Sequence, residues 1–268
     1  MKKSLTALLL CMAGLSSNAN ANIFSFMTAP GWDSNWLVGA KVGVASAQGP
    51  FVLTVVNADD GQNVYNRKFH DESFMAGLLA GYQARCGRWL AGLELNADWR
   101  NLDSTHDFAD TSSNLGIPVI ILPAPVGVLA GGSGFVGSVK YERNWALGLS
   151  ARFGYAVANY LMPYIRLGVE TSDDELSVSF LPVAGTFAGS QVAFSESDWT
   201  YRLFGGFGIE MPFPYLMEGL SVRAEYDYYH RGQGVTARTS AFANATGFTA
   251  EMKQRNQTGT LALVWNFG

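Results

Sequence analysis

Residues 89–100 read Trp-Leu-Ala-Gly-Leu-Glu-Leu-Asn-Ala-Asp-Trp-Arg, and this stretch decides the fold. Its odd positions, from Trp89 to Trp99, are all apolar, whereas its even positions after Leu90 are small, polar or charged. Strict alternation is typical of a β-strand whose two faces meet different environments. The path from Trp89 to Trp99 covers roughly 25 Å at ~3.3 Å per residue and ~40° tilt, the height of the lipid-facing band of a membrane barrel. The stretch therefore predicts a membrane-spanning strand rather than a strand of a soluble sandwich.

Seven further stretches alternate in the same way. They begin at Trp36, Phe74, Trp145, Ile165, Trp199, Leu220 and Leu261. No helical periodicity competes, and in lipid only helices or closed sheets satisfy every backbone N–H and C=O group. Eight is an even number, as bacterial single-chain barrels require. The sequence therefore predicts an all-β fold, an eight-stranded antiparallel transmembrane β-barrel.

The connections between these stretches alternate in length. Short turns are expected at 83–88, 156–162 and 212–219, and long loops at about 46–73, 102–139, 171–198 and 231–256. Short turns at one end and long loops at the other are typical of outer-membrane barrels, in which the turns are periplasmic and the loops extracellular.

The first residues predict export. Lys2 and Lys3 precede an apolar run at 5–15, and Ala19-Asn20-Ala21 is a typical cleavage site, so residues 1–21 are expected to be a cleaved signal peptide. Residues 22–268 would then form the outer-membrane barrel domain. Cys86 is the single cysteine after cleavage, which excludes an internal disulfide. The net charge of −4 leaves no basic footprint and argues against a nucleic-acid partner.

Three stretches carry a resemblance to a known family. They are Gly-Leu-Glu at 92–94, Leu-Ser-Val-Arg-Ala-Glu-Tyr-Asp-Tyr at 220–228 and Leu-Ala-Leu-Val-Trp-Asn-Phe at 261–267. With them the chain resembles the small eight-stranded outer-membrane barrels grouped around opacity proteins and the OmpA transmembrane domain. The resemblance implies a bacterial outer-membrane location. It is specific for fold and not for activity, since such proteins serve as adhesins, anchors, small pores and surface antigens.

The last of these stretches resembles the insertion signal that the barrel-assembly machinery reads. Leu263, Trp265 and Phe267 would carry this signal. The chain departs from the pattern at its end, because Gly268 follows the aromatic residue with which the signal normally closes.

The inward-facing positions of the predicted strands carry charges. They include Lys41, Glu94, Arg152, Arg166, Glu170, Arg202, Arg223 and Glu225. Opposite charges are expected to pair there, because isolated buried ions cost several kcal/mol each. A salt-bridge plug that fixes the barrel shape is favoured, since an eight-stranded interior is just wide enough for side chains to fill it. An ion gate or narrow pore is the alternative.

Tryptophans recur at the ends of the apolar faces and predict an aromatic girdle that contacts outer-membrane lipid and lipopolysaccharide. The predicted girdle residues are Trp36, Trp89, Trp99, Trp145, Trp199 and Trp265.

Apolar residues also gather in the predicted loops, at 51–56, 116–128 and 180–194. Exposed patches of this kind mark surfaces that bind a host, a partner protein or a hydrophobic small molecule. The favoured alternative is that these stretches extend the strands and pack together as a cap above the membrane. The two interpretations are compatible if the cap keeps an exposed apolar face.

An enzyme is a weaker hypothesis. His70, His106 and His230 fall at predicted outer strand ends, and Asp71 and Ser73 could complete a serine–histidine–acid set. No spacing matches a lipid A deacylase or an omptin-type protease, and no histidine pair has metal-ligand spacing. We therefore expect no catalytic residues, no metal and no cofactor.

The sequence favours a non-enzymatic outer-membrane surface protein with a charge-plugged barrel, whose loops mediate surface contact or adhesion. A small pore or channel for ions or small hydrophobic solutes is the alternative, and a rim-located lipid-modifying enzyme is third.

Overall fold

The computed structural model describes residues 31–57, 62–110, 135–158, 160–182, 191–232, 234–239 and 245–268. The predicted signal peptide and the apolar stretch 116–128 lie outside these residues. No helix in the described ranges is long and apolar enough to cross a membrane.

Ten strands occupy the described residues. They are β1 (Asp33–Asn57), β2 (Gln62–Cys86), β3 (Trp89–Asp110), β4 (Phe135–Tyr155), β5 (Met162–Pro182), β6 (Val192–Pro212), β7 (Leu220–Tyr229), β8 (Val235–Thr239), β9 (Ala245–Met252) and β10 (Arg255–Phe267).

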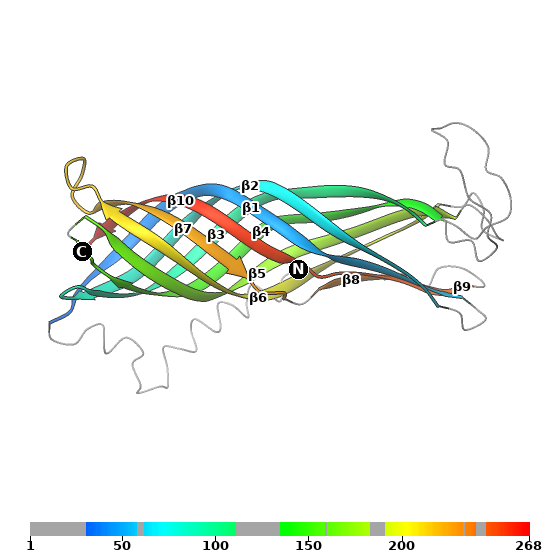
Figure 1. Cartoon of the computed structure of the whole chain (residues 1–268), viewed down its shortest axis with the longest axis horizontal. Coiled ribbons are helices and arrows are strands. Elements are labelled where there is room, and N and C mark those ends of the chain that lie inside the picture. The colour runs from blue at the N-terminus through cyan, green and yellow to red at the C-terminus, as the bar shows by residue number, and fades with distance from the viewer. Residues whose placement is uncertain are drawn as a thin grey trace.

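Eight of these strands close into a ring, which confirms the predicted fold (Figure 1). β1 to β7 pair in sequence order as antiparallel neighbours, and β10 lies between β7 and β1. The closing pair of β1 and β10 runs from Trp36 opposite Phe267 to Gln48 opposite Arg255. Closure pairs each ring strand with a neighbour on both sides, as a membrane-spanning sheet requires.

Short turns connect the strands at the end of the barrel where β10 finishes. Gly87 lies between β2 and β3 with a φ of 59°, a left-handed conformation that glycine adopts without strain. Residues 156–158 with 160–161, and residues 213–219, belong to the other two turns at this end.

The bounds predicted for the long connections were wrong, because the strands continue far beyond the lipid-facing band. β1 and β2 have 25 residues each, roughly 80 Å of extended chain at ~3.3 Å per residue. Within the described ranges, most of 46–73, 102–110, 135–139, 171–182 and 192–198 is therefore strand. The prediction ended each strand where its outward residues ceased to be apolar, a criterion that holds only in lipid.

The predicted loop 231–256 also contains strands. β9 pairs with the outer part of β1, from Phe51 opposite Met252 to Asn57 opposite Ala245. β8 pairs with β9 and lies against β6 and β5, with no backbone pairing to either of them among the described residues. β8 and β9 thus continue the wall above β7 and β10. We call this part, with the outer ends of β1 to β6, the extracellular tube.

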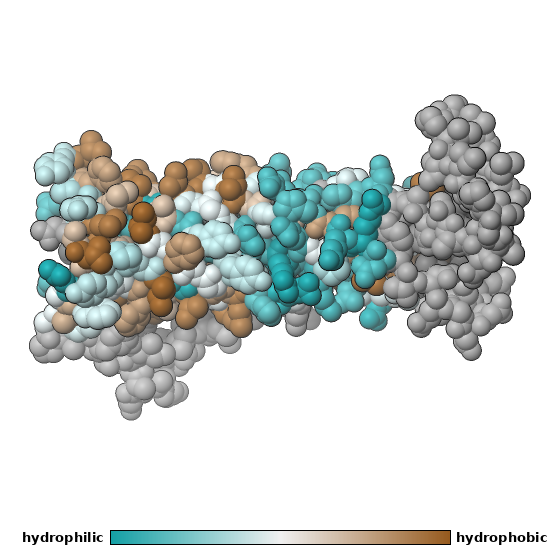
Figure 2. All heavy atoms as spheres, viewed as in Figure 1, coloured by the Kyte–Doolittle hydropathy of each residue, from teal (hydrophilic) through white to brown (hydrophobic). Residues whose placement is uncertain are grey.

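The polarity of the inner and outer faces reverses where the tube begins. In the lipid-facing part of β1, Val42 and Val44 point outward and Lys41 points inward, whereas in the tube Phe51 and Leu53 point inward. Figure 2 shows the result on the surface, with hydrophobic residues gathered on one half of the barrel and hydrophilic residues on the other. Outward residues face lipid in the first half and water in the second, so the inner and outer chemistry is exchanged.

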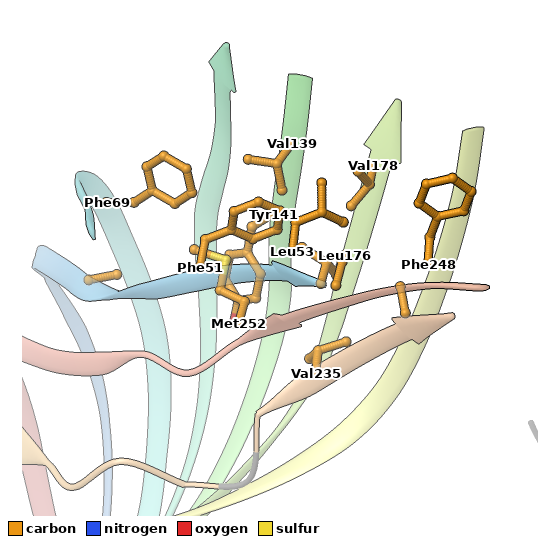
Figure 3. Packing of buried hydrophobic residues seen from close by; sticks show 13 residues of the cluster. Phe51, Leu53, Phe69, Val139, Tyr141, Leu176, Val178, Val235, Phe248 and Met252 are labelled. Carbon is orange, nitrogen blue, oxygen red and sulfur yellow. The ribbon is translucent and has the colours of Figure 1, made fainter. Parts of the chain in front are cut away.

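The inside of the tube is a hydrophobic core, seen in Figure 3. This tube core consists of Ala47, Phe51, Leu53, Phe69, Val139, Tyr141, Leu176, Val178, Val235, Ala237, Phe248, Ala250 and Met252. Each fully buried large side chain contributes about 1.5–3 kcal/mol. The apolar residues Phe51 and Leu53, predicted in a loop, therefore stabilise the tube from within, as the favoured cap hypothesis expected.

Replacing Leu176 by alanine should loosen the tube and leave the membrane ring intact. Leu176 is fully buried in the tube core, and such a truncation costs about 2–5 kcal/mol. We expect faster protease cleavage of the tube in intact membranes, with an unchanged shift between heated and unheated protein on gels. Ser195→Ala, an exposed change on the same tube, is the control. Equal protease resistance of both variants would contradict the proposed role of the core.

Candidate functional site

The interior of the membrane-spanning barrel is filled with charged side chains. Among the described residues, seven buried cations face seven buried anions. The cations are Lys41, Arg100, Arg143, Arg152, Arg166, Arg202 and Arg223, and the anions are Glu94, Asp98, Glu170, Asp174, Glu210, Glu225 and Asp227. All eight charges predicted to face inward are among them.

Four of these residues form a closed square near the periplasmic end. Arg152 donates to Glu94 at 2.5 Å and to Glu210 at 2.8 Å. Arg223 donates to the same two carboxylates, at 2.6 Å to Glu94 and 2.9 Å to Glu210. Each carboxylate thus lies between two guanidinium groups, and each guanidinium lies between two carboxylates.

The pair of Glu94 and Arg223 crosses the whole lumen. Glu94 lies on β3 and Arg223 on β7, and four steps around the ring of eight separate these strands in either direction. A contact of 2.6 Å between them means that side chains from opposite walls meet in the middle. An eight-stranded barrel is just narrow enough for such contacts.

Further ion pairs lie beyond the square. Arg166 contacts Glu225 at 2.6 Å and Asp227 at 3.3 Å, and it donates to the Ser150 hydroxyl at 3.1 Å. The Tyr164 hydroxyl donates to Glu225 at 2.5 Å.

On another part of the wall, Lys41 contacts Asp98 at 2.9 Å. Arg100 donates to both oxygens of Glu170 and lies 3.7 Å from Asp98. This two-pronged contact between a guanidinium and a carboxylate is stronger and more directional than a single hydrogen bond.

A last cluster separates the charged interior from the tube core. Asp174 accepts from Arg143 at 2.7 and 3.1 Å, from Thr200 at 2.6 Å, and from Arg202. Arg143 also donates to the hydroxyl of Tyr141, which belongs to the tube core. Burial raises the pKa of Tyr141 above its ordinary value, so its hydroxyl stays protonated at neutral pH.

Every buried anion named above lies within 4.0 Å of a buried cation. The pairs are Lys41–Asp98, Arg100–Glu170, Arg143–Asp174, Arg202–Asp174, Arg152–Glu94, Arg152–Glu210, Arg223–Glu94, Arg223–Glu210, Arg166–Glu225 and Arg166–Asp227. Mutual neutralisation is what makes burial of these ions tolerable, because an uncompensated buried charge costs several kcal/mol.

Alternation along the strands positions most of these charges, but sequence reasoning missed six of them. Asp98, Arg100, Glu210 and Asp227 occupy inward positions of strands that were predicted, so the same pattern could have found them. Asp174 fell in a predicted loop. Arg143 has the same parity as the outward Trp145, and a shift of register between them turns Arg143 inward. A bulge of this kind has no clear signal in the sequence.

The tryptophans of the predicted girdle lie in two groups on the outer wall. Trp36, Trp89 and Trp265 are exposed toward the turn end, and Trp99 and Trp145 are exposed toward the tube. The rings of Trp99 and Trp145 contact each other, with centroids 4.7 Å apart. Trp199 is partly buried.

The residues of the predicted insertion signal all point outward from β10. Leu263, Trp265 and Phe267 are exposed to the lipid side and lie opposite Ala40, Val38 and Trp36 of β1.

The three histidines do not come together. His70 points outward and lies 3.5 Å from Glu72, and the backbone amide of His230 donates to the Leu203 carbonyl. His106 points inward, with its Nε2 2.9 Å from Asp71 and its ring stacked on Phe69.

The serine–histidine–acid set that the weaker enzyme hypothesis would require is not assembled, since the Ser73 hydroxyl makes no hydrogen bond within the described part of the chain. In the same part, no three His, Cys, Asp or Glu side chains are placed to hold a metal ion. Cys86 is partly exposed and is a free thiol.

Replacing Glu94 by glutamine should destabilise the barrel by about 3–5 kcal/mol, because Arg152 and Arg223 would then share Glu210 alone. Urea unfolding of the refolded protein in detergent measures this change. His70→Gln, which removes an exposed pair, should cost less than about 1 kcal/mol and is the control. A Glu94→Gln variant as stable as this control would show that the square contributes little.

Three solved structures of outer-membrane proteins are similar to this chain. Neisserial surface protein A is 13% identical, with 86% of this chain and 97% of that chain covered and a TM-score of 0.35. OprG from Pseudomonas aeruginosa is 12% identical, with 87% and 96% covered and a TM-score of 0.43. Ail, the attachment invasion locus protein of Yersinia pestis, is 13% identical, with 84% and 97% covered and a TM-score of 0.28.

No curated protein matches the chain significantly. The family model described as outer membrane protein beta-barrel domain matches residues 7–267, almost the whole sequence. The chain therefore belongs to the family of outer membrane protein beta-barrel domains.

Proposed function

We propose that this protein is a non-enzymatic surface protein of the bacterial outer membrane, whose barrel is a closed anchor and whose extracellular tube carries contact segments. The proposal includes removal of residues 1–21 as a signal peptide during export, and insertion through the signal at Leu263, Trp265 and Phe267.

The observation that carries the proposal is the neutral, cross-linked interior. An open pore needs a continuous path, and the contact between Glu94 and Arg223 joins opposite walls at 2.6 Å. Arg143, Arg202 and Asp174 lie between this level and the tube core. Charges that neutralise one another across a narrow lumen favour an anchor over a conduit.

The construction of the extracellular tube supports the proposal that it carries contact segments. Its outer face is polar, with Lys140 paired to Asp103 at 3.3 Å and to Glu142 at 2.5 Å, while its inner face is the tube core. A wall of this construction holds its shape in water far from the membrane. In the sequence, 111–134 join β3 to β4 and 183–190 lie between β5 and β6, and 116–128 is strongly apolar. We infer that these segments contact a host or other surface ligand.

A channel for small hydrophobic solutes is the second candidate. The observation that favours it is the apolar inside of the tube, which a hydrophobic solute would enter more readily than a polar one. The charged cluster around Asp174 lies directly beneath this core and opposes further passage.

Refolded mature protein in a planar bilayer should carry no discrete current, since ion pairs fill the lumen at several levels. Glu94→Ala or Arg223→Ala would open space between the walls and should introduce current. Protein shown to be folded by its gel shift is required for each recording. Regular current steps from the unaltered protein would overturn the closed anchor and favour the pore.

Replacing residues 112–133 by a short glycine–serine linker should abolish attachment of expressing cells to host cells or matrix, because the change removes the apolar segment 116–128. The barrel should still insert, since these residues lie outside the ring strands. Shortening 213–219 at the opposite end, without loss of insertion, is the matched control. Undiminished attachment after loss of 112–133 would count against a contact role for that segment.

A further inference from the structure

A groove of about 580 Å³ opens on the outer wall of the barrel, across β2, β1, β10 and β7. Its apolar floor is formed by Val44, Phe74, Tyr226 and Gly259. Gly259 lies opposite Val44 on one side and Tyr226 on the other. A Cβ atom at Gly259 would meet no atom within 4 Å, so this glycine leaves an open slot between two exposed neighbours. We call it the Gly259 groove.

The height of the groove follows from the strands. Val44 lies eight residues beyond Trp36 on β1, and Phe74 lies eight residues from Tyr82 on β2. Trp36 and Tyr82 contact each other at the periplasmic end. Eight residues correspond to about 20 Å across a membrane at ~3.3 Å per residue and ~40° tilt. The floor of the groove therefore lies in the hydrocarbon of the outer leaflet.

The mouth of the groove is polar. The next outward positions above the floor are Ser46, Glu72 and Gln257, all of which line the groove. They bring a hydroxyl, a carboxylate and an amide to the level where hydrocarbon gives way to lipid headgroups.

Cationic side chains follow directly above the mouth. Arg255 is the next outward residue of β10 beyond Gln257, and it is exposed opposite Gln48. Lys68 is an exposed outward residue of β2, two steps beyond Glu72. Within the described ranges no carboxylate lies within 4.0 Å of either, so both are available to an anionic headgroup, whereas Glu72 lies beside His70. Each basic residue near an anionic membrane surface attracts it measurably.

We propose that the Gly259 groove binds lipid A, the phosphorylated glucosamine lipid that anchors lipopolysaccharide, with one acyl chain in the slot and a phosphate near Arg255. The groove is part of the lipid-facing wall, so a membrane lipid covers it. Lipid A matches the apolar slot, the hydroxyl and amide at its mouth and the cations above it, while the Glu72 carboxylate lies 3.5 Å from His70 and takes no part in the match. Its amide and hydroxyl groups match Gln257 and Ser46, and its phosphates match Arg255 and Lys68. The inference rests on the membrane ring and is independent of the proposed contact function.

Native mass spectrometry of the refolded protein in detergent tests the site with two probes, purified rough lipopolysaccharide and phosphatidylglycerol. The unaltered protein should retain one lipopolysaccharide and bind phosphatidylglycerol more weakly. Gly259→Leu fills the slot and should weaken lipopolysaccharide binding roughly tenfold, the effect of excluding a few buried methylene groups. Ala40→Leu introduces the same side chain on the outer face of β1 below the groove and should leave binding unchanged.

Two more variants distinguish binding of the lipid's acyl chain from binding of its phosphorylated headgroup. Val44→Trp fills the slot from β1 and should reproduce the effect of Gly259→Leu, which keeps the test decisive if Gly259→Leu does not fold. Arg255→Gln should weaken lipopolysaccharide binding about threefold. Equal binding by the unaltered protein and both slot-filling variants overturns the proposal. So does an equal loss in Ala40→Leu, or binding of phosphatidylglycerol as tight as that of lipopolysaccharide.

Discussion

The contact between Glu94 and Arg223 unites opposite walls of the ring, and the rest of the barrel depends on charges that neutralise one another in this way. Lipid surrounds the ring, so ionisable side chains can only face inward, where water is scarce. An eight-stranded ring brings those side chains within reach of each other. The buried cations and anions, equal in number among the described residues, then make a dense interior that holds the strands in register.

The same strands face lipid in the ring and water in the tube, and this explains why the tube can be a direct continuation of the ring. Along β1, Lys41 and Phe51 face inward ten residues apart, one among ions and the other in an apolar core. The backbone geometry is unchanged between them, and only the environment of the outer face differs. Arg143 and Asp174 lie at the boundary, where Arg143 also contacts Tyr141 of the tube core.

The sequence predicted the ring because the alternation between Trp89 and Trp99 indicates a strand with one face in contact with lipid. It predicted the inward face of the charged positions for the same reason. It could not predict where the strands end, since beyond the lipid Phe51 and Leu53 become inner residues and the outer ones become polar. Arg143 was not predicted because a register shift before Trp145 turns its side chain to the opposite face from the one that alternation along the strand indicates. The contact between Glu94 and Arg223 depends on the number of strands in the ring and on the stagger between them. The alternation of residues along one strand contains neither.

The pairing of β1 with β10 has a consequence for how such a chain matures. The first strand of the ring finds its second neighbour only in the last, from Trp36 opposite Phe267 onward. Until that strand arrives, β1 and β7 both present bare edges that would recruit other chains. A chain that lacks the last strand would therefore form an open, aggregation-prone sheet and not a smaller barrel. Cells that make this protein need a chaperone that shields these edges between synthesis and closure of the barrel.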